Sequence, residues 1–348
     1  TWSHYTRYGS SSNSLSHTSI LSLHKDMQGN IWVGTYYGGV NVFNPDKNNH
    51  SFYCAEPLRE DCLSFPVVGK MTEDSAGNVW ICTEGGGLNC YHGDTGVFSR
   101  YMYQKGDQST LGSNNVKSVF YRKENNRLYA GTHLGGLFVL DLKSNKGHTL
   151  HHVTGDPASL PHEIVNDIQE YKDGIAMLTQ GGPVFFDPVT EKFSPLTDDP
   201  SVQKLISREY AFETFLIDSR HRMWFAVGGG GIVCVNLSSS KVTQYLADSE
   251  KDTLTVGRYK TVHIFEDNKG DIYFSTIGAG IFKYQEKQDT FKSYGTTNGV
   301  LPSNYCYYIC ESARDNCLLV LHGKGLSIFD REKEVTEETY HLFRQTYN

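Results

Sequence analysis

Short runs of apolar residues alternate with turn-forming residues along the chain, and this pattern repeats. In its first copy, apolar runs cover residues 20–23, 31–35 and 40–43, and a further run begins near residue 52. An Asp-x-x-Gly turn separates the first two runs, and a Gly-Gly pair separates the second from the third. Aspartate and glycine at such positions let a chain reverse within a few residues. The pattern therefore predicts four short antiparallel strands in each copy.

One column of mostly aromatic residues marks each copy of this unit. The column consists of Trp32, Trp80, Tyr129, Ala176, Trp224, Tyr273 and Leu319, spaced 46 to 49 residues apart. A single four-stranded sheet cannot bury both of its faces, whereas sheets stacked radially bury each large side chain against the next sheet. We therefore predict an all-β fold with almost no helix, a seven-bladed β-propeller of four-stranded antiparallel blades centred near these residues.

A second column, two positions further on, is mostly small. It consists of Gly34, Cys82, Gly131, Ala226 and Ser275, with Leu178 and Leu321 in the two weakest copies. Small residues permit a close approach of neighbouring chains near the axis of a propeller. This column therefore supports the radial arrangement.

The first residues of the chain repeat the pattern of a fourth strand, because Trp2–Tyr5 resembles Phe98–Tyr101 in sequence and spacing. We expect residues 1–13 to be an outer strand and lead-in, and residues 14–348 to be the propeller. The outer strand either closes the ring, beside Leu326–Asp330 or the strand after it, or is left from an upstream blade. Both readings stay open.

The charge balance excludes one class of partner. The formal net charge is -7 and the pI is near 6.0, so no basic surface is available to neutralise a phosphate backbone. We expect no nucleic acid to bind this region. No apolar run approaches the roughly 20 residues that span a bilayer, and membrane contact is expected only through segments outside this chain.

Cysteine usage does not identify a scaffold or a metal site. The chain has 8 cysteines and no C-x-x-C pair, and most of them are expected to be small buried residues. Cys54 and Cys62 flank a loop. A disulfide between these two residues and a pair of free thiols both fit the sequence.

Four phrases of the sequence resemble the two-component regulator propeller repeat. They are Asn13–Ser16, Asp26–Thr35, Gly38–Pro45 and Leu301–Asn304. The resemblance covers nearly the whole chain and is weakest in the fourth and seventh copies, where Ala176 and Leu319 replace the aromatic residue.

This resemblance implies a periplasmic sensor domain of a hybrid two-component system of the Bacteroides type. Such a sensor recognises oligosaccharides derived from glycans, signals as a homodimer and controls polysaccharide-utilisation genes. The histidine kinase and DNA-binding parts of such proteins are absent from this sequence. The resemblance does not name the glycan, because fold alone does not fix function.

No motif indicates catalysis, a metal or a cofactor. The aspartates six residues before the aromatic column, Asp26, Asp74, Asp218 and Asp267, are interpreted as turn residues because each begins a chain reversal. Gly228–Gly231 lacks the Lys-Ser/Thr that would follow in a phosphate-binding loop. The sequence also has no H-E-x-x-H and no G-x-S-x-G motif. We therefore expect this region not to be an enzyme.

Two other classes of protein stay open beside the sensor. Propeller enzymes of the streptogramin-lyase type share a similar Asp-x-x-Gly-Asn-x-Trp phrase, and a propeller can also act as a scaffold that binds proteins. Metal-dependent turnover of a small molecule would favour the lyase. A bound glycan without turnover would favour the sensor, and neither result would leave the scaffold.

Strand order predicts the face that binds a ligand. The loops that lead into the first strands and the turns between second and third strands emerge on one side, opposite the Asp-x-x-Gly turns. The ligand-binding candidates on this side are Tyr36, Tyr37, His133, His162, Arg208, Arg258, Tyr259, Asn304 and Tyr305, and the same side collects His17, Glu84, Gln180, Glu209 and His322. Sugars need such a mixture of aromatic planes and directional polar groups. Whether the site lies wholly within this propeller stays open.

Overall fold

The computed structural model describes residues 15–17, 19–44, 49–56, 59, 61–208, 211–247, 256–312 and 316–340. The fold is a seven-bladed β-propeller of four-stranded antiparallel blades, as predicted. The chain divides into two compact units, each of which is described by itself. The N-terminal unit comprises Ser16–Asp198 and Ile206–Arg208, and the C-terminal unit comprises Thr1–Leu15, Asp199–Leu205 and Glu209–Asn348.

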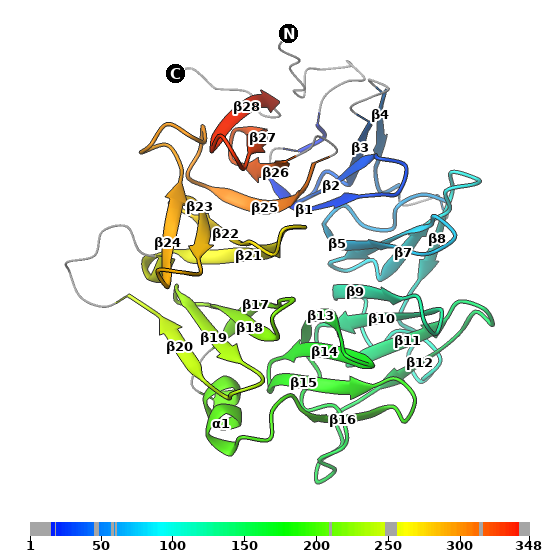
Figure 1. The fold of residues 1–348 in the computed structure, drawn as a ribbon. Helices are drawn as coiled ribbons and strands as arrows, with labels where there is room; N and C mark the ends of the chain where they lie inside the picture. Colours follow the sequence, from blue (N-terminus) through cyan, green and yellow to red (C-terminus); the bar gives the residue numbers. More distant parts are fainter. Residues whose placement is uncertain are drawn as a thin grey trace. The chain divides into compact units, whose positions relative to one another are not determined.

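The N-terminal unit contains blades 1 to 4, and in each blade the strands pair in sequence order. The strands are β1 (Ile20–Lys25), β2 (Ile31–Thr35), β3 (Val40–Asn44) and β4 (Asn49–Tyr53) in blade 1, β5 (Val68–Glu73), β6 (Val79–Thr83), β7 (Leu88–Tyr91) and β8 (Phe98–Tyr101) in blade 2, β9 (Val116–Arg122), β10 (Arg127–Thr132), β11 (Leu137–Asp141) and β12 (Lys146–Leu150) in blade 3, and β13 (Val165–Tyr171), β14 (Gly174–Thr179), β15 (Gly182–Asp187) and β16 (Lys192–Pro195) in blade 4. The first strands β1, β5, β9 and β13 contact one another in that order (Figure 1).

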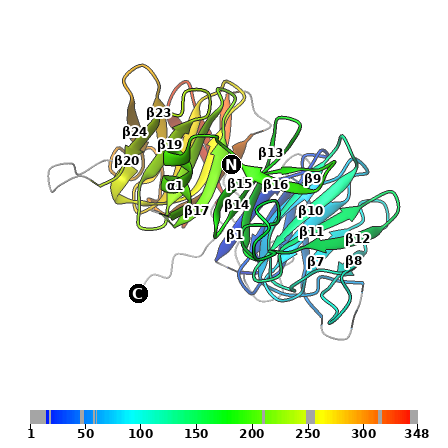
Figure 2. The same ribbon diagram turned by 90° about the horizontal axis from the view of Figure 1, so that it is seen from below.

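The C-terminal unit contains blades 5 to 7. The strands are β17 (Phe212–Ile217), β18 (Arg222–Val227), β19 (Ile232–Asn236) and β20 (Val242–Tyr245) in blade 5, β21 (Lys260–Glu266), β22 (Ile272–Ile277), β23 (Gly280–Gln285) and β24 (Thr290–Tyr294) in blade 6, and β25 (Cys306–Glu311), β26 (Cys317–His322), β27 (Gly325–Asp330) and β28 (Val335–Tyr340) in blade 7. Here β17 contacts β21, and β21 contacts β25. Figure 2 shows the strands from a second direction.

Within the part of the chain that the structure describes, two short helices interrupt the repeat. The helix α1 (Pro200–Arg208) precedes blade 5, and the 3-10 helix η1 (Val256–Arg258) precedes blade 6. Almost no helix was expected from the sequence, and the positions of these two were not predicted. The start of α1 carries a recognisable signal, because the Asp199 carboxylate accepts the Ser201 and Val202 N–H groups as an N-cap.

The aromatic column is buried between blades, as predicted. Trp32 packs with Val68, Val79 and Ile81 of the next blade, and Trp224 is 0% exposed. Replacing such a residue by alanine is expected to cost about 3 to 5 kcal/mol, because it leaves a cavity between two sheets.

The Asp-x-x-Gly turn is fastened to the aromatic column. Asp26 Oδ2 accepts a hydrogen bond from Trp32 Nε1 at 2.7 Å, while Asp26 Oδ1 accepts the Asn30 N–H at 2.7 Å. The same two bonds recur in blades 2 and 5. The interpretation of these aspartates as structural turn residues is therefore confirmed for these three blades.

Glycine is required where the second and third strands meet. Gly87 has a φ of +74°, and a Cβ at this position would lie 2.2 Å from the carbonyl oxygen of Tyr101 in the fourth strand. Gly280 has a φ of +86°, and a Cβ there would lie 2.1 Å from the Tyr294 oxygen. Any other residue would force the outer strand away.

Close approach of neighbouring atoms also explains the column of small residues two positions after the aromatic column. A Cβ on Gly34 would lie 2.4 Å from Ser22 Oγ and 2.7 Å from Val68 of the next blade. The close approach is thus between the second strand of one blade and the first strand of the next. Leu178 and Leu321, the two departures from this column, are both buried.

Three expectations about covalent links and chain ends have different outcomes. Residues 1–13 lie outside the described residues, so their outer strand stays a prediction. One of its two proposed places, beside Leu326–Asp330, was wrong because β27 already pairs with β26 and β28. Cys54 and Cys62 are free thiols in the structure.

Candidate functional site

Hydrogen bonds between blades hold together the side that the strand order predicted for ligand binding. Two glycine N–H groups of a second-to-third-strand turn donate to one carbonyl of the next blade's leading loop. The acceptors are the carbonyl oxygens of Asn114 (3.0 and 2.8 Å), Glu163 (3.1 and 2.9 Å) and Asn304 (2.9 and 2.8 Å). In each unit, these turns and loops form what we call the Gly-turn face. The Asp-x-x-Gly turns form the opposite side, the Asp-turn face.

Tyr36 and Tyr37 form an exposed aromatic pair on the Gly-turn face of the N-terminal unit. Their exposed fractions are 39% and 61%, and their ring centroids lie 4.4 Å apart with the planes at 72°. Tyr37 has a φ of +70°, a left-handed backbone that L-residues adopt rarely and mostly at turns. Two exposed rings at a constrained turn offer flat apolar surface to a ligand.

Charged groups of the next two blades lie beside this pair. The hydroxyl of Tyr37 raises the pKa of Tyr36, and the Glu84 carboxylate of blade 2 contributes to the increase. Glu84 also accepts a hydrogen bond from Lys117 Nζ of blade 3 at 2.8 Å. The Gly-turn face of blades 1 to 3 therefore combines two aromatic rings with a carboxylate and an ammonium group.

The histidine candidates of this unit are less accessible. His133 is half-buried, and its backbone N–H donates to the Asn115 carbonyl oxygen at 2.8 Å. His162 is also half-buried, and its Nδ1 accepts the Ile164 N–H at 3.0 Å. Arg208 is the last residue of α1, and its side chain lies outside the described residues. The structure thus brings Tyr36 and Tyr37 together, and the side chain of His162 fixes its own loop.

The other four candidates belong to the C-terminal unit. Arg258 ends η1 and is exposed, while the neighbouring Tyr259 packs its ring 6.2 Å from that of Phe282. Asn304 Oδ1 accepts the Thr296 N–H at 2.8 Å, so its side chain orders the loop. Tyr305 is 55% exposed. Arg258 and Tyr305 are the residues of this set best placed to meet a ligand.

His322, which the strand order also assigned to the Gly-turn face, is a structural residue. It is 0% exposed, its Nε2 lies 2.7 Å from Ser327 Oγ, and its Nδ1 accepts the Lys324 N–H. Among the described residues, no group of three His, Cys, Asp or Glu side chains is placed to hold a metal ion.

Sequence reasoning missed the charged residues of the first strands. Each of the seven first strands has an irregular register near its beginning, and such bulges redirect side chains. Lys117 lies at the bulge of β9. In β5, Lys70 Nζ lies 2.5 Å from Asp167 Oδ1 of β13. In the sequence, both lysines are charged residues near the beginning of a first strand.

A comparison of sequence repeats bears on the family of this chain. Residues 14–37 match the repeat described as "Two component regulator propeller". The predicted resemblance is confirmed. The matched residues include β1, β2 and the tyrosine pair, so the exposed rings lie at the end of the segment that matches this repeat.

Solved structures from several sources share the fold. One is the extracellular domain assigned to a hybrid two-component system of B. thetaiotaomicron, with 18% identity and a TM-score of 0.67 over 97% of this chain and 49% of that one. PorZ, a surface component of the type-IX secretion system of Porphyromonas gingivalis, has 15% identity and a TM-score of 0.64 over 93% and 48%. A computationally designed protein, Ika8, has 13% identity and a TM-score of 0.60 over 95% and 90%.

The chain spans about half the length of the two natural proteins. No curated protein matches it. Within the described residues, no helix has the length and apolar character needed to cross a membrane.

Proposed function

We propose that this chain is the ligand-sensing, extracytoplasmic propeller of a hybrid two-component system, and that it binds a glycan-derived oligosaccharide without cleaving it. The match of residues 14–37 to the two-component regulator propeller repeat carries this proposal. The shared fold with the extracellular domain from B. thetaiotaomicron supports it.

The Gly-turn face of the N-terminal unit is the proposed ligand surface. Sugars stack their C–H faces on aromatic rings and satisfy their hydroxyls with directional polar groups. Tyr36 and Tyr37 provide the rings, and the Glu84–Lys117 pair provides an acceptor and a donor. Arg258 and Tyr305 offer similar groups in the C-terminal unit.

The remainder of the proposed protein follows from this assignment. The propeller is periplasmic, the full-length sensor is a homodimer, and a histidine kinase and response regulator outside this chain control polysaccharide-utilisation genes. Ligand binding shifts the equilibrium between two states of the dimer by the difference of its affinities for them.

The test is a thermal-shift screen of the isolated chain against oligosaccharides released from plant, host and microbial glycans, followed by calorimetry with each hit. Tyr37→Ala is expected to weaken binding of a hit by about tenfold, because it removes one good contact of roughly 1 to 2 kcal/mol. The melting temperature should not change, since the ring is exposed.

Phe52→Ala is the matched control, because Phe52 is an aromatic residue of similar exposure, 46%, on the outer strand β4. It should leave the affinity unchanged. Chromatography of the recovered sugar completes the test. A cleaved product would show that the chain is an enzyme of the lyase or hydrolase class rather than a sensor. If Tyr37→Ala binds the sugar as tightly as Phe52→Ala does, the tyrosine pair is not part of the site.

A further inference from the structure

A pocket of about 460 Å³ lies between blades 1 and 2, at the Asp-turn face of the N-terminal unit. This volume falls within the roughly 300 to 1,000 Å³ that is usual for small-molecule sites. Its lining comes from the Asp-x-x-Gly turns, the second strands and the ends of the third strands of both blades, and from β4 of blade 1. The pocket and the tyrosine pair therefore lie at opposite ends of the strands of blade 1.

Three aromatic side chains line this pocket. The ring of Trp32 lies 6.2 Å from that of Tyr53, nearly parallel at 12°, and 5.0 Å from that of Tyr91, at 64°. The hydroxyl of Tyr53 donates to that of Tyr91 at 3.0 Å. The pocket thus has an aromatic wall with one polar edge.

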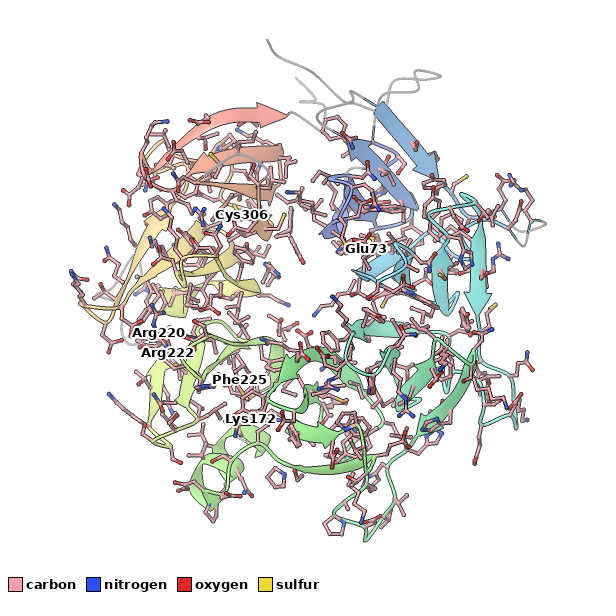
Figure 3. All side chains as sticks on the ribbon, turned by 45° about the vertical axis from the view of Figure 1, so that its right-hand side comes forward. Glu73, Lys172, Arg220, Arg222, Phe225 and Cys306 are labelled. Atoms are coloured by element: carbon pink, nitrogen blue, oxygen red, sulfur yellow. The ribbon has the colours of Figure 1, made fainter. Side chains whose placement is uncertain are left out.

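The charges at this pocket are all negative among the described residues that line it. Asp26 and Asp94 contribute carboxylates, and the lining includes no lysine, arginine or histidine. Glu73, labelled in Figure 3, lies close by, and its Oε2 accepts the Met27 N–H at 2.7 Å. Burial raises the pKa of Glu73, and the Asp26 and Asp74 carboxylates raise it further. Among the described lining residues, carboxylates are present and no side chain supplies a positive charge.

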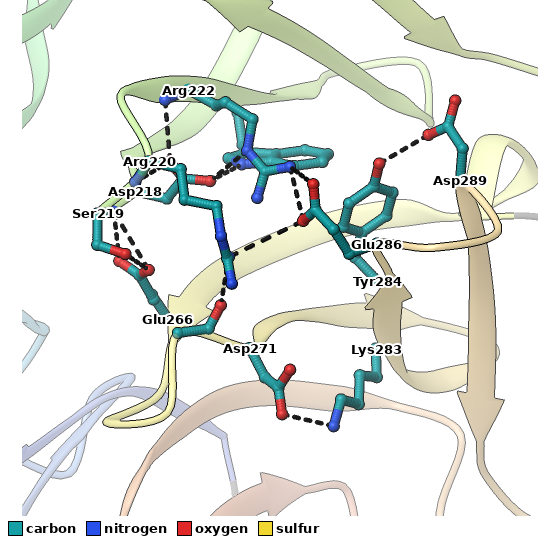
Figure 4. Close-up of polar contacts among 12 residues, drawn as sticks. Asp218, Ser219, Arg220, Arg222, Glu266, Asp271, Lys283, Tyr284, Glu286 and Asp289 are labelled. Atoms are coloured by element: carbon teal, nitrogen blue, oxygen red, sulfur yellow. Dashed lines mark hydrogen bonds and ion pairs between the residues drawn. The ribbon is translucent and has the colours of Figure 1, made fainter.

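Blades 5 and 6 contain the same aromatic frame with its space filled. The ring of Trp224 lies 6.2 Å from that of Tyr245, at 15°, and 4.9 Å from that of Tyr284, at 62°. The Arg222 guanidinium lies over two of these rings, 5.0 Å from the centroid of Trp224 and 5.4 Å from that of Tyr284. It donates to Asp218 at 2.7 Å and to Glu286 at 2.7 and 2.8 Å (Figure 4).

Asn30 occupies in blade 1 the position of Arg222 in blade 5, two residues before the tryptophan. Its side-chain Nδ2 donates to Asp26 Oδ2 at 2.7 Å, the same bond that Arg222 Nε makes to Asp218 Oδ2 at 2.7 Å. The Asn30 side chain is shorter than that of an arginine, so it does not reach the space that a guanidinium would occupy. Gly93 contributes no side chain to the space, and a Cβ there would lie 2.6 Å from the Gly77 carbonyl oxygen.

At the other contacts between blades within a unit, side chains of the protein reach across or pack against the neighbouring blade. Leu142 packs against the cluster that contains Trp80 between blades 2 and 3. Arg127 reaches Glu191 at 3.3 Å between blades 3 and 4, and Arg331 reaches Asp267 at 2.7 Å between blades 6 and 7. Of these five contacts among the described residues, three hold an arginine, one holds a leucine, and one is a pocket.

We infer that the pocket between blades 1 and 2 binds a guanidinium group of a ligand, placed over Trp32 and Tyr91 and beside the Asp26 and Asp94 carboxylates. A guanidinium stacks on aromatic faces and pairs with carboxylates in one plane, which is the geometry that Arg222 shows in blade 5. This site is separate from the proposed oligosaccharide surface, and neither proposal depends on the other.

The test uses N-acetyl-arginine methylamide, whose only charge is its guanidinium, and the neutral isostere N-acetyl-citrulline methylamide. Each is titrated into the whole ¹⁵N-labelled chain while the indole N–H signals are followed, with Trp32 and Trp224 assigned from their Phe variants. The arginine compound is expected to shift the Trp32 signal and not the Trp224 signal, because Arg222 already covers Trp224. The citrulline compound should bind at least about tenfold more weakly, since it lacks the charge.

Asn30→Arg should abolish the shift, because its own guanidinium would fill the pocket. Asp94→Asn provides a second, exposed variant that does not depend on repacking, and it should weaken binding by about threefold. Asp173→Asn is its control, since Asp173 is an exposed carboxylate on the Asp-turn face of blade 4. Equal binding of the two compounds, or an unchanged shift in Asn30→Arg, would overturn the inference.

Discussion

The contact between blades 1 and 2 and the contact between blades 5 and 6 share one aromatic frame and differ in what occupies it. Corresponding ring distances agree within 0.1 Å, at 5.0 and 4.9 Å for the edge-on pair and 6.2 Å for the stacked pair. In blade 5 an arginine fills the frame, and in blade 1 an asparagine leaves a pocket of about 460 Å³. A repeat fold can therefore keep its aromatic scaffold and, through the residues at the positions of Asn30 and Gly93, leave a pocket where another blade is packed.

The largest expected difference between the two contacts concerns the tryptophans. Trp224→Ala should lower the free energy of unfolding by about 5 kcal/mol and Trp32→Ala by about 3 kcal/mol. Both variants lose a buried indole, but only the first also removes the ring beneath Arg222, a contact worth about 1 to 2 kcal/mol when desolvated. Urea unfolding of both variants measures the difference. Equal losses would mean that Arg222 contributes nothing through the ring.

The next largest expected difference is in the pH dependence of stability, because blade 1 has a histidine where blade 5 has a leucine. His24 pairs with Trp32 across β1 and β2, where blade 5 has Leu216 opposite Trp224. His24 Nε2 is buried without a hydrogen-bond partner, and burial lowers the pKa of His24 to about 4. As the pH falls below about 6.5, the unfolded chain therefore binds a proton that the folded chain does not.

His24→Leu should remove this acid sensitivity. Stability of the wild type is expected to fall by up to roughly 3 kcal/mol more than that of the variant as the pH falls from 6.5 to 4. The check is urea unfolding of both proteins at several pH values, since the other titrating groups are common to the two. Parallel pH profiles would contradict a buried neutral His24.

The smallest expected effect is that of Asn30→Arg on stability. The arginine can keep the bond to Asp26 and add stacking on Trp32, while it orders a long side chain. The melting temperature should stay the same or rise slightly, corresponding to less than about 1 kcal/mol. A strongly destabilised variant would show that the two aromatic frames are not interchangeable.

The sequence predicts the fold well because the strongest blades carry their own local signals and the even spacing locates the weaker ones. The Asp-x-x-Gly turn, the tryptophan six residues after the aspartate and the Gly-Gly pair act within one blade, so their spacing suffices to count blades. Strand order also places Tyr36 and Tyr37 at an exposed turn. These features depend on contacts near in sequence.

The pocket and the loop roles were not predicted, because they depend on contacts between blades. Arg222 and its partner Glu286 are 64 residues apart, so only the packing of two sheets reveals their contact. The Asn30 side chain instead bonds to Asp26 and Asn44 of its own blade. Asn304 looks like a ligand residue in the sequence, yet its side chain accepts a backbone N–H from Thr296. Residue type alone does not distinguish a loop-fixing amide from a sugar-binding one.

By the two proposals together, the two ends of blade 1 bind different ligands. The most direct measurement is a crystal structure of the chain with an oligosaccharide found by the screen and N-acetyl-arginine methylamide bound together. We expect the sugar over Tyr36 and Tyr37 and the guanidinium over Trp32 and Tyr91. A sugar in the pocket between blades 1 and 2, with no ligand on the tyrosine pair, would contradict both assignments.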